Sequence, residues 1–250
     1  MSLPTGIQGI LLAYDTGILP PPFSHVFQLS LDWSKGDLDT KLDLHYTDRE
    51  GLSEEELLDE GFSLHDDYRF AGKIDSSWTQ ALQGLLAETR WSNKPLEEGG
   101  IVLSFLPKQA KEDIKTPSNQ EDWLLLAQEI IQAIYETSKK EAPLTLRYQK
   151  VEASQTRECV LTLYFATRSV RVTVQGVSQP WPWEEATRLM KLVFTPDYDY
   201  SKASTSPGKQ PGAYLDCGDG YWFALGKGIT NSHPSFDAVQ KIKSTFDRFF

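Results

Sequence analysis

A regular alternation of apolar and polar side chains between residues 25 and 46 constrains the fold of this chain most. One side of the first segment consists of Phe27, Leu29, Leu31 and Trp33. After a turn at Ser34 to Asp37, the return segment continues the pattern with Leu38, Leu42, Leu44 and Tyr46. Successive side chains of a strand point to opposite faces. The pattern therefore predicts a hairpin in an antiparallel sheet that buries one face and leaves the other in water.

Several further segments carry the spacing of strands. The predicted strands are Ile7 to Ala13, Asp66 to Ile74, Gly100 to Pro107, a meander at Leu144 to Val151, Cys159 to Phe165 and Val170 to Gln175, and a hairpin at residues 213 to 229. By contrast, residues 195 to 212 have no apolar periodicity and are expected to form a long loop. Long loops in compact domains are usually either functional or disordered.

Apolar residues spaced three and four apart predict helices between these strands. Ser53 and Glu56 form a capping box at the start of a short helix, and Asp75 is expected to cap the next one. A second capping box, Ser118 with Glu121, is expected to open the longest helix, in which Ile130 lies on a wide apolar stripe. Two more helices are expected, one after Pro182 and one at the C-terminus. The chain is thus predicted to be α+β, with antiparallel sheets and helices packed on one face.

Two segments of the chain resemble each other. The segment DDYRFAGKI matches GDGYWFALGKGI when Tyr68 is aligned with Tyr221 and Phe70 with Phe223. Each segment is expected to be a strand that a helix follows. The match raises the hypothesis of two related halves with Tyr68 and Tyr221 at equivalent positions. The alternative, which is favoured, is a coincidence between two unrelated strand-to-helix junctions, because aromatic residues favour strands and glycine favours their ends.

The length of 250 residues fits one large domain or two small ones. The polar stretch from Lys108 to Asn119 is the best candidate for a linker. We therefore expect an acidic half at residues 1–115 and a second half at residues 116–250, or a single compact domain that contains both.

The net charge of −10 is unevenly distributed. Residues 1 to 138 hold 24 Asp and Glu but only 10 Lys and Arg, whereas residues 139 to 191 hold 5 and 9. This acidic balance argues against nucleic acids and anionic membranes as ligands. The meander carries Arg147, Arg157, Arg168 and Arg171. They are expected on a solvated face, or in a basic patch that docks onto an acidic surface such as that of another copy. The sequence does not decide whether copies associate.

The expected compartment is the cytoplasm. The two cysteines, Cys159 and Cys217, are too few for a disulfide framework and are expected to be reduced thiols. No apolar run is long enough to span a bilayer, and the apolar start of the chain lacks the basic residues of a signal peptide.

The densest group of potential metal ligands is centred on His65 and Asp67, which can share one face of a strand. Asp43 and His45, on the polar side of the hairpin, could complete a ligand set. The competing interpretation is a polar strand entry. On that interpretation the four side chains do not converge, and Asp66 or Asp67 bonds to backbone N–H groups or points to solvent. This second interpretation is favoured, so no metal, cofactor or catalytic residue is assigned.

Two classes of function remain. The first is a non-catalytic protein-binding or regulatory protein, which uses the acidic region 37 to 67 or the loop 195 to 212 as its contact surface. The second is a metal-dependent hydrolase that uses His65, Asp67, Asp43 and His45. The first class is favoured because no catalytic motif has its partners in place.

Overall fold

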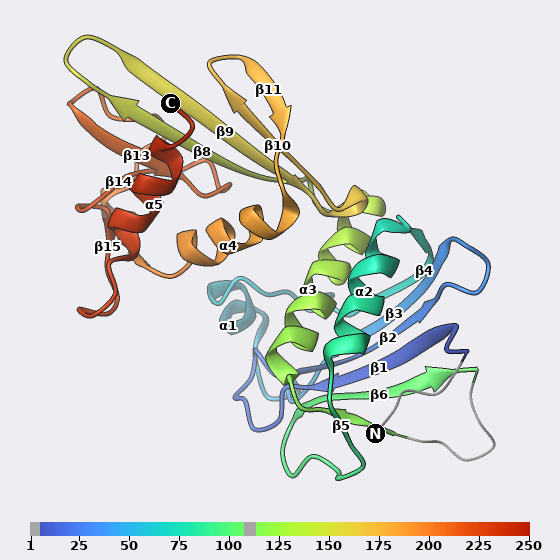
Figure 1. Cartoon of the computed structure of the whole chain (residues 1–250). Coiled ribbons are helices and arrows are strands. Elements are labelled where there is room, and N and C mark those ends of the chain that lie inside the picture. The colour runs from blue at the N-terminus through green and yellow to red at the C-terminus, as the bar shows by residue number, and fades with distance from the viewer. Residues whose placement is uncertain (1–5, 108–113) are drawn as a thin grey trace. The chain divides into compact units, whose positions relative to one another are not determined.

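A computed structural model describes residues 6–107 and 114–250, which form an α+β protein in two compact units (Figure 1). The first unit comprises residues 1–140 and the second residues 141–250. The division thus follows Lys140, not residue 115, and the longest helix belongs to the first unit. The expected linker from Lys108 to Asn119 lies partly outside the described residues, and its described part also belongs to the first unit.

The first unit contains a five-stranded antiparallel sheet in the order β4-β3-β2-β1-β6. Its strands are β1 (Gly9–Asp15), β2 (His25–Asp32), β3 (Leu38–Tyr46), β4 (Tyr68–Ile74) and β6 (Gly100–Leu106). The predicted hairpin is confirmed: β2 pairs with β3, Phe27 lies opposite Leu44, and both side chains are buried. Two short strands, β5 (Trp91–Ser92) and β7 (Thr116–Pro117), pair with each other.

Three helices complete the first unit: α1 (Glu54–Asp59), α2 (Ser77–Glu88) and α3 (Gln120–Thr137). Helices α2 and α3 lie side by side over one face of the sheet (Figure 1). They bury Trp78, Trp123 and Ile130 completely against the apolar face of the strands. The other face of the sheet carries the half-buried and exposed residues of the alternation.

The predicted helix starts are confirmed in part. The capping box of Ser53 and Glu56 is present at α1. Asp75, two residues before the start of α2, accepts a hydrogen bond from the Ser77 N–H at 2.8 Å, while Ser76 occupies the cap position itself. The predicted box of Ser118 and Glu121 is wrong, because α3 begins at Gln120 after Asn119. The Ser118 N–H instead donates to the Arg90 carbonyl and extends the β5–β7 pairing, which delays the helix.

The second unit contains a six-stranded antiparallel sheet in the order β11-β10-β9-β8-β13-β14. Its strands are β8 (Leu144–Val151), β9 (Thr156–Tyr164), β10 (Ser169–Val174), β11 (Val177–Pro180), β13 (Gly212–Asp216) and β14 (Trp222–Ala224). Helices α4 (Trp183–Val193) and α5 (Ala238–Asp247) pack against each other. The Tyr148 ring of β8 stacks on the Phe246 ring of α5 with centroids 4.7 Å apart. The predicted meander, hairpin and both helices are thus confirmed.

The segment 195 to 212 is more structured than a plain loop. It contains β12 (Asp197–Tyr198), which pairs with β15 (Ile229–Thr230), and a turn of 3-10 helix at Tyr200–Lys202. The Tyr198 hydroxyl donates to the Val193 carbonyl at 2.6 Å, and the Tyr200 hydroxyl donates to Asp219 at 2.8 Å. These side-chain hydrogen bonds and the β12–β15 pairing fix the segment although it has no apolar periodicity.

The two sheets share an order of connections. In each, a four-strand meander is followed by a helix, and the next strand of the same sheet, β6 or β13, pairs with the first strand of the meander. A further helix follows, after the additional strand β14 in the second sheet. The expected equivalence of Tyr68 and Tyr221 is wrong, however. Tyr68 begins β4, the last strand of the first meander, whereas Tyr221 precedes β14 at the opposite end of its sheet. By chain order, β4 corresponds to β11.

Candidate functional site

Three of the four candidate metal ligands lie together on the first unit. Asp43 and His45 project from the same face of β3, and Asp67 immediately precedes β4. The His45 Nε2 atom lies 2.6 Å from the Asp43 carboxylate, and its Nδ1 atom lies 2.8 Å from Asp67. Asp67 also accepts a hydrogen bond from the Tyr46 N–H at 2.9 Å. The expectation that these residues do not converge is therefore wrong for three of them.

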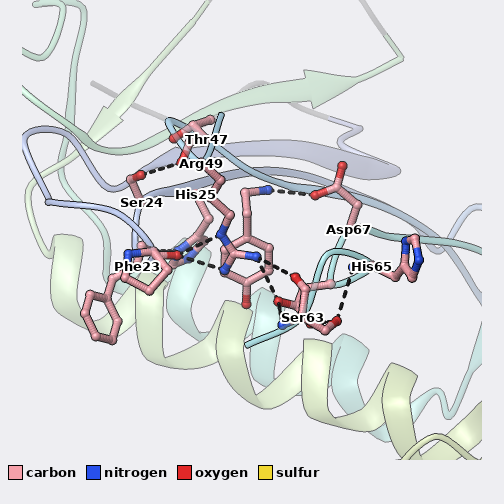
Figure 2. Close-up of polar contacts among 11 residues, drawn as sticks. Phe23, Ser24, His25, Thr47, Arg49, Ser63, His65 and Asp67 are labelled. Carbon is pink, nitrogen blue, oxygen red and sulfur yellow. Dashed lines mark hydrogen bonds and ion pairs between the residues drawn. The ribbon is translucent and has the colours of Figure 1, made fainter. Parts of the chain in front are cut away.

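His65, the fourth candidate, lies apart from this group. Its side chain is exposed, and its backbone N–H donates to the Ser63 hydroxyl at 3.1 Å (Figure 2). The expectation that Asp66 or Asp67 bonds to backbone N–H groups or points to solvent is confirmed, and both residues accept such bonds. Asp66 accepts from the Ser63 N–H at 2.8 Å, and Asp67 accepts from Tyr46.

The arrangement of Asp43, His45 and Asp67 is that of an ion-pair cluster. The imidazole lies between the two carboxylates, so each ring nitrogen faces a different acid and the two acids lie on opposite sides of the ring. Arg69 adds a cation, with its Nε atom 2.9 Å from Asp43. Within residues 6–107 and 114–250, no group of three or more His, Cys, Asp and Glu side chains is arranged to hold a metal ion.

The pKa values of the cluster shift as expected for ion pairs. The hydrogen bond to Asp67, and then the charge of Asp43, raise the pKa of His45. The bond from the Tyr46 N–H, followed by that from His45, lowers the pKa of Asp67, and the Arg69 guanidinium lowers the pKa of Asp43. Each shift favours the charged form, so the cluster holds two carboxylates, one guanidinium and a readily protonated imidazole.

Arg49 organises the chain next to this cluster (Figure 2). Its Nε and Nη2 atoms donate to the Pro22 carbonyl at 3.0 and 2.8 Å. Its Nη1 atom donates to the Ser63 carbonyl at 3.2 Å and to the Asp66 carboxylate at 2.8 Å. The guanidinium also stacks on the Tyr46 ring, 3.8 Å from its centroid. Only 13% of the Arg49 side chain is exposed, so it acts as an internal tie between three loops.

Asp66 is the counter-ion of the Arg49 guanidinium. Its partial burial disfavours the charged form, but hydrogen bonds from the Ser63 N–H and from Arg49 outweigh that cost and lower the pKa of Asp66. The charge of Arg49 is therefore neutralised inside the fold. No local pattern in the sequence marks Arg49 as a tie, because the residues that it binds are 14 to 27 positions away in the chain. The available signal was its position as the one basic residue among many acids.

Residues 48–67, which we call the acidic segment, contain nine Asp and Glu residues and a single arginine, Arg49. Most of these carboxylates are exposed: Asp48, Glu54, Glu55, Glu56, Asp59, Glu60 and Asp67 lie on the surface or close to it. Two apolar side chains, Leu58 and Leu64, are each 59% exposed among them. Because Asp66 neutralises Arg49, the segment presents an almost purely negative surface with apolar side chains inside it.

The cysteines and the arginines of the second unit have structural contacts. Both cysteines are free, and burial raises the pKa of each thiol to about 12, so neither is an activated nucleophile. Arg157 pairs with Glu152 at 2.8 Å and Arg168 pairs with Glu184 at 3.3 Å. Arg147 lies 3.8 Å from Asp216, so three of the four arginines on the expected solvated face form ion pairs within the second unit.

Comparison with family models, with curated proteins and with solved structures finds no match to this chain. Among the residues that the structure describes, none of the helices is long and apolar enough to cross a membrane.

Proposed function

We propose that this protein is a non-catalytic binding protein that recognises a basic surface of another protein through its acidic segment. The observation that carries the proposal is the concentration of nine carboxylates in residues 48–67, where the single arginine is buried and already paired. A surface of one charge steers an oppositely charged partner and rejects like-charged ones. Nucleic acids and anionic membranes carry the wrong charge for this surface.

The conformation of the acidic segment supports the proposal. The capping box of Ser53 and Glu56 starts α1, and Leu57 anchors the helix with 1% of its surface exposed. Arg49 joins both ends of the segment to the Pro22 loop. A surface that is ordered before it binds loses less conformational freedom on association, so more of the contact energy appears as affinity.

The exposed leucines support a protein as the partner. Leu58 and Leu64 supply apolar contact area that a small cation would not need. Interfaces between proteins combine a desolvated apolar centre with a charged rim. We propose the cytoplasm as the location because both cysteines are free thiols.

The proposal is tested by capturing partners from an extract of the native cell. The bait is the full chain, compared with the variant Glu55→Lys/Asp59→Lys/Glu60→Lys, which leaves the capping box intact. The matched control reverses three exposed carboxylates of the second unit, Glu158→Lys/Glu185→Lys/Asp197→Lys. We expect a basic protein that binds to the wild-type and control baits but not to the variant bait. Salt at 0.5 M should release this protein from both baits that bind it. A partner that all three baits retain equally would contradict the proposal.

A further inference from the structure

A hollow of about 710 Å³ opens on the face of the first sheet that lies opposite α2 and α3. The pairing register places Val102, Ala13, Gln28 and Asp43 in one row across β6, β1, β2 and β3. Ala13, Val26 and Val102 form its floor, and Leu96 adds an apolar wall. None of the floor residues is fully buried. Apolar surface is therefore accessible to a ligand inside the hollow.

The rim of this hollow is acidic. Asp15, Glu97 and Glu98 line it together with Asp43 and His45. Asp43 is already paired with Arg69 and His45. Glu97 and Glu98 are exposed and form no ion pair with any described residue, and Asp15 accepts one hydrogen bond, from the Gly17 N–H at 2.7 Å. Among residues 6–107 and 114–250, these three carboxylates at the rim have no cationic partner.

Close backbone packing positions the wall that carries Glu97 and Glu98. A Cβ atom at Gly99 would collide with the backbone of Asp15 and Gly17, and one at Gly17 would lie 2.8 Å from the Gly99 nitrogen. Only glycine fits at such an approach. The wall is therefore held directly against the end of β1, which keeps its carboxylates beside the apolar floor.

We propose that this hollow receives an arginine or lysine side chain of the protein partner, an inference that rests on the proposed function. Both side chains have an apolar stem and a charged head. The stem would lie on Ala13, Val26 and Val102, while the head would meet the carboxylates of Asp15, Glu97 and Glu98. Charge-assisted bonds of this kind are stronger than neutral ones and set the orientation of the ligand. The volume suits one long side chain with its flanking backbone.

A neighbouring hollow on the same face provides an internal comparison. It has a volume of about 580 Å³ and shares Gln28 and Asp43 with the first. Its charged residues include Lys41 and Arg69, and its apolar residues include Leu11 and Ala71. A cation should therefore enter the first hollow and avoid the second, although the two adjoin.

The test uses methyl NMR of the full chain titrated with N-acetyl-arginine methylamide, and with the citrulline analogue as an uncharged probe of the same shape. We expect saturable shifts of the Ala13, Val26 and Val102 methyls with the arginine probe, at a Kd of roughly 1–10 mM for so small a ligand. The Leu11 and Ala71 methyls should remain in place. The citrulline probe should bind at least ten times more weakly.

Two variants separate this inference from the proposed function. Glu97→Gln/Glu98→Gln should weaken the arginine probe at least fivefold, whereas Glu55→Gln/Asp59→Asn, outside the hollow, should leave its Kd unchanged. If the floor methyls do not shift, or shift equally with citrulline, the hollow is not a cation site. The acidic segment could still bind its partner in the capture experiment. If the probe binds as expected but no basic partner is captured, the proposed function fails, while the assignment of the hollow as a cation site stands.

Discussion

The Asp66 carboxylate accepts a hydrogen bond at 2.8 Å from the Nη1 atom of Arg49, inside a loop cluster where both side chains are largely buried. This contact joins the acidic segment to the Pro22 loop. Arg49→Ala removes it together with the bonds to Pro22 and Ser63, and leaves Asp66 without its counter-ion. We expect a loss of about 2–3 kcal/mol in the free energy of unfolding, measured by urea denaturation.

Arg69→Ala is the matched control for this prediction. Arg69 also pairs with an aspartate, at 2.9 Å from Asp43, but 73% of its side chain is exposed. Ion pairs at the surface contribute little, so the loss should stay below about 1 kcal/mol. Equal losses from the two substitutions would mean that Arg49 is not an internal tie.

The His45 cluster predicts a pH dependence with a definite sign. The pKa of His45 is raised, so its contribution to stability is complete below the pKa of the unfolded chain and disappears as pH rises through the folded pKa. The pKa of Asp67 is lowered, so its contribution is complete above its unfolded pKa and disappears as pH falls through the folded value. The pair therefore stabilises the first unit most between about pH 4 and 6.5.

NMR titration of the His45 ring tests this dependence. The midpoint should lie above the ordinary value for histidine, and Asp67→Asn should lower it. Asp37→Asn breaks the Lys73 ion pair, 2.7 Å long, elsewhere on the same sheet, and should leave the midpoint in place. If the titration midpoint of His45 is the same in the wild type and in Asp67→Asn, the two side chains do not interact in solution.

Divalent ions distinguish the ion-pair cluster from a metal site. With both ring nitrogens of His45 facing carboxylates and Arg69 beside them, we expect Zn²⁺, Mn²⁺ and Mg²⁺ at 1 mM to leave the melting temperature unchanged. A ligand that binds only the folded state would raise it. A rise of several degrees with one ion, abolished by Asp67→Asn, would favour the metal-dependent hydrolase instead.

The core of the first unit is tested at Ile130, which is fully buried on α3. Ile130→Ala removes buried methyl groups and leaves a cavity, so we expect a loss of roughly 2–5 kcal/mol in the free energy of unfolding. Gln128→Ala, at an exposed position of the same helix, should change it by less than about 0.5 kcal/mol. An unchanged denaturation midpoint for Ile130→Ala would contradict this packing.

The sequence predicts local periodic features of this fold well. The alternation around Phe27 and Leu44 and the stripe around Ile130 predict elements that the structure contains, because burial of one face leaves a repeating pattern. Contacts between distant segments leave no such pattern. For that reason the sequence predicts neither the Arg49 tie nor the position of the His45 ring between Asp43 and Asp67.

The resemblance between the Tyr68 and Tyr221 segments shows the same limit. Both segments lead into edge strands, and aromatic residues such as those they share are enriched in strands generally, whatever the place of the strand in the topology. The order of connections, with β4 corresponding to β11, is the stronger argument for related halves, and it cannot be read from six matched residues. A duplication of this kind remains a prediction.

The most direct test of the central claim is the affinity of the full chain for its captured partner, measured by calorimetry at 50 and 300 mM salt. For the wild type, we expect the affinity to fall at least tenfold between these salt concentrations, because the carboxylates of residues 48–67 attract a basic surface. The variant Glu55→Lys/Asp59→Lys/Glu60→Lys should bind at least tenfold more weakly at 50 mM salt and show little dependence on salt. Equal affinities for wild type and variant at both salt concentrations would contradict the assignment of the acidic segment as the binding surface.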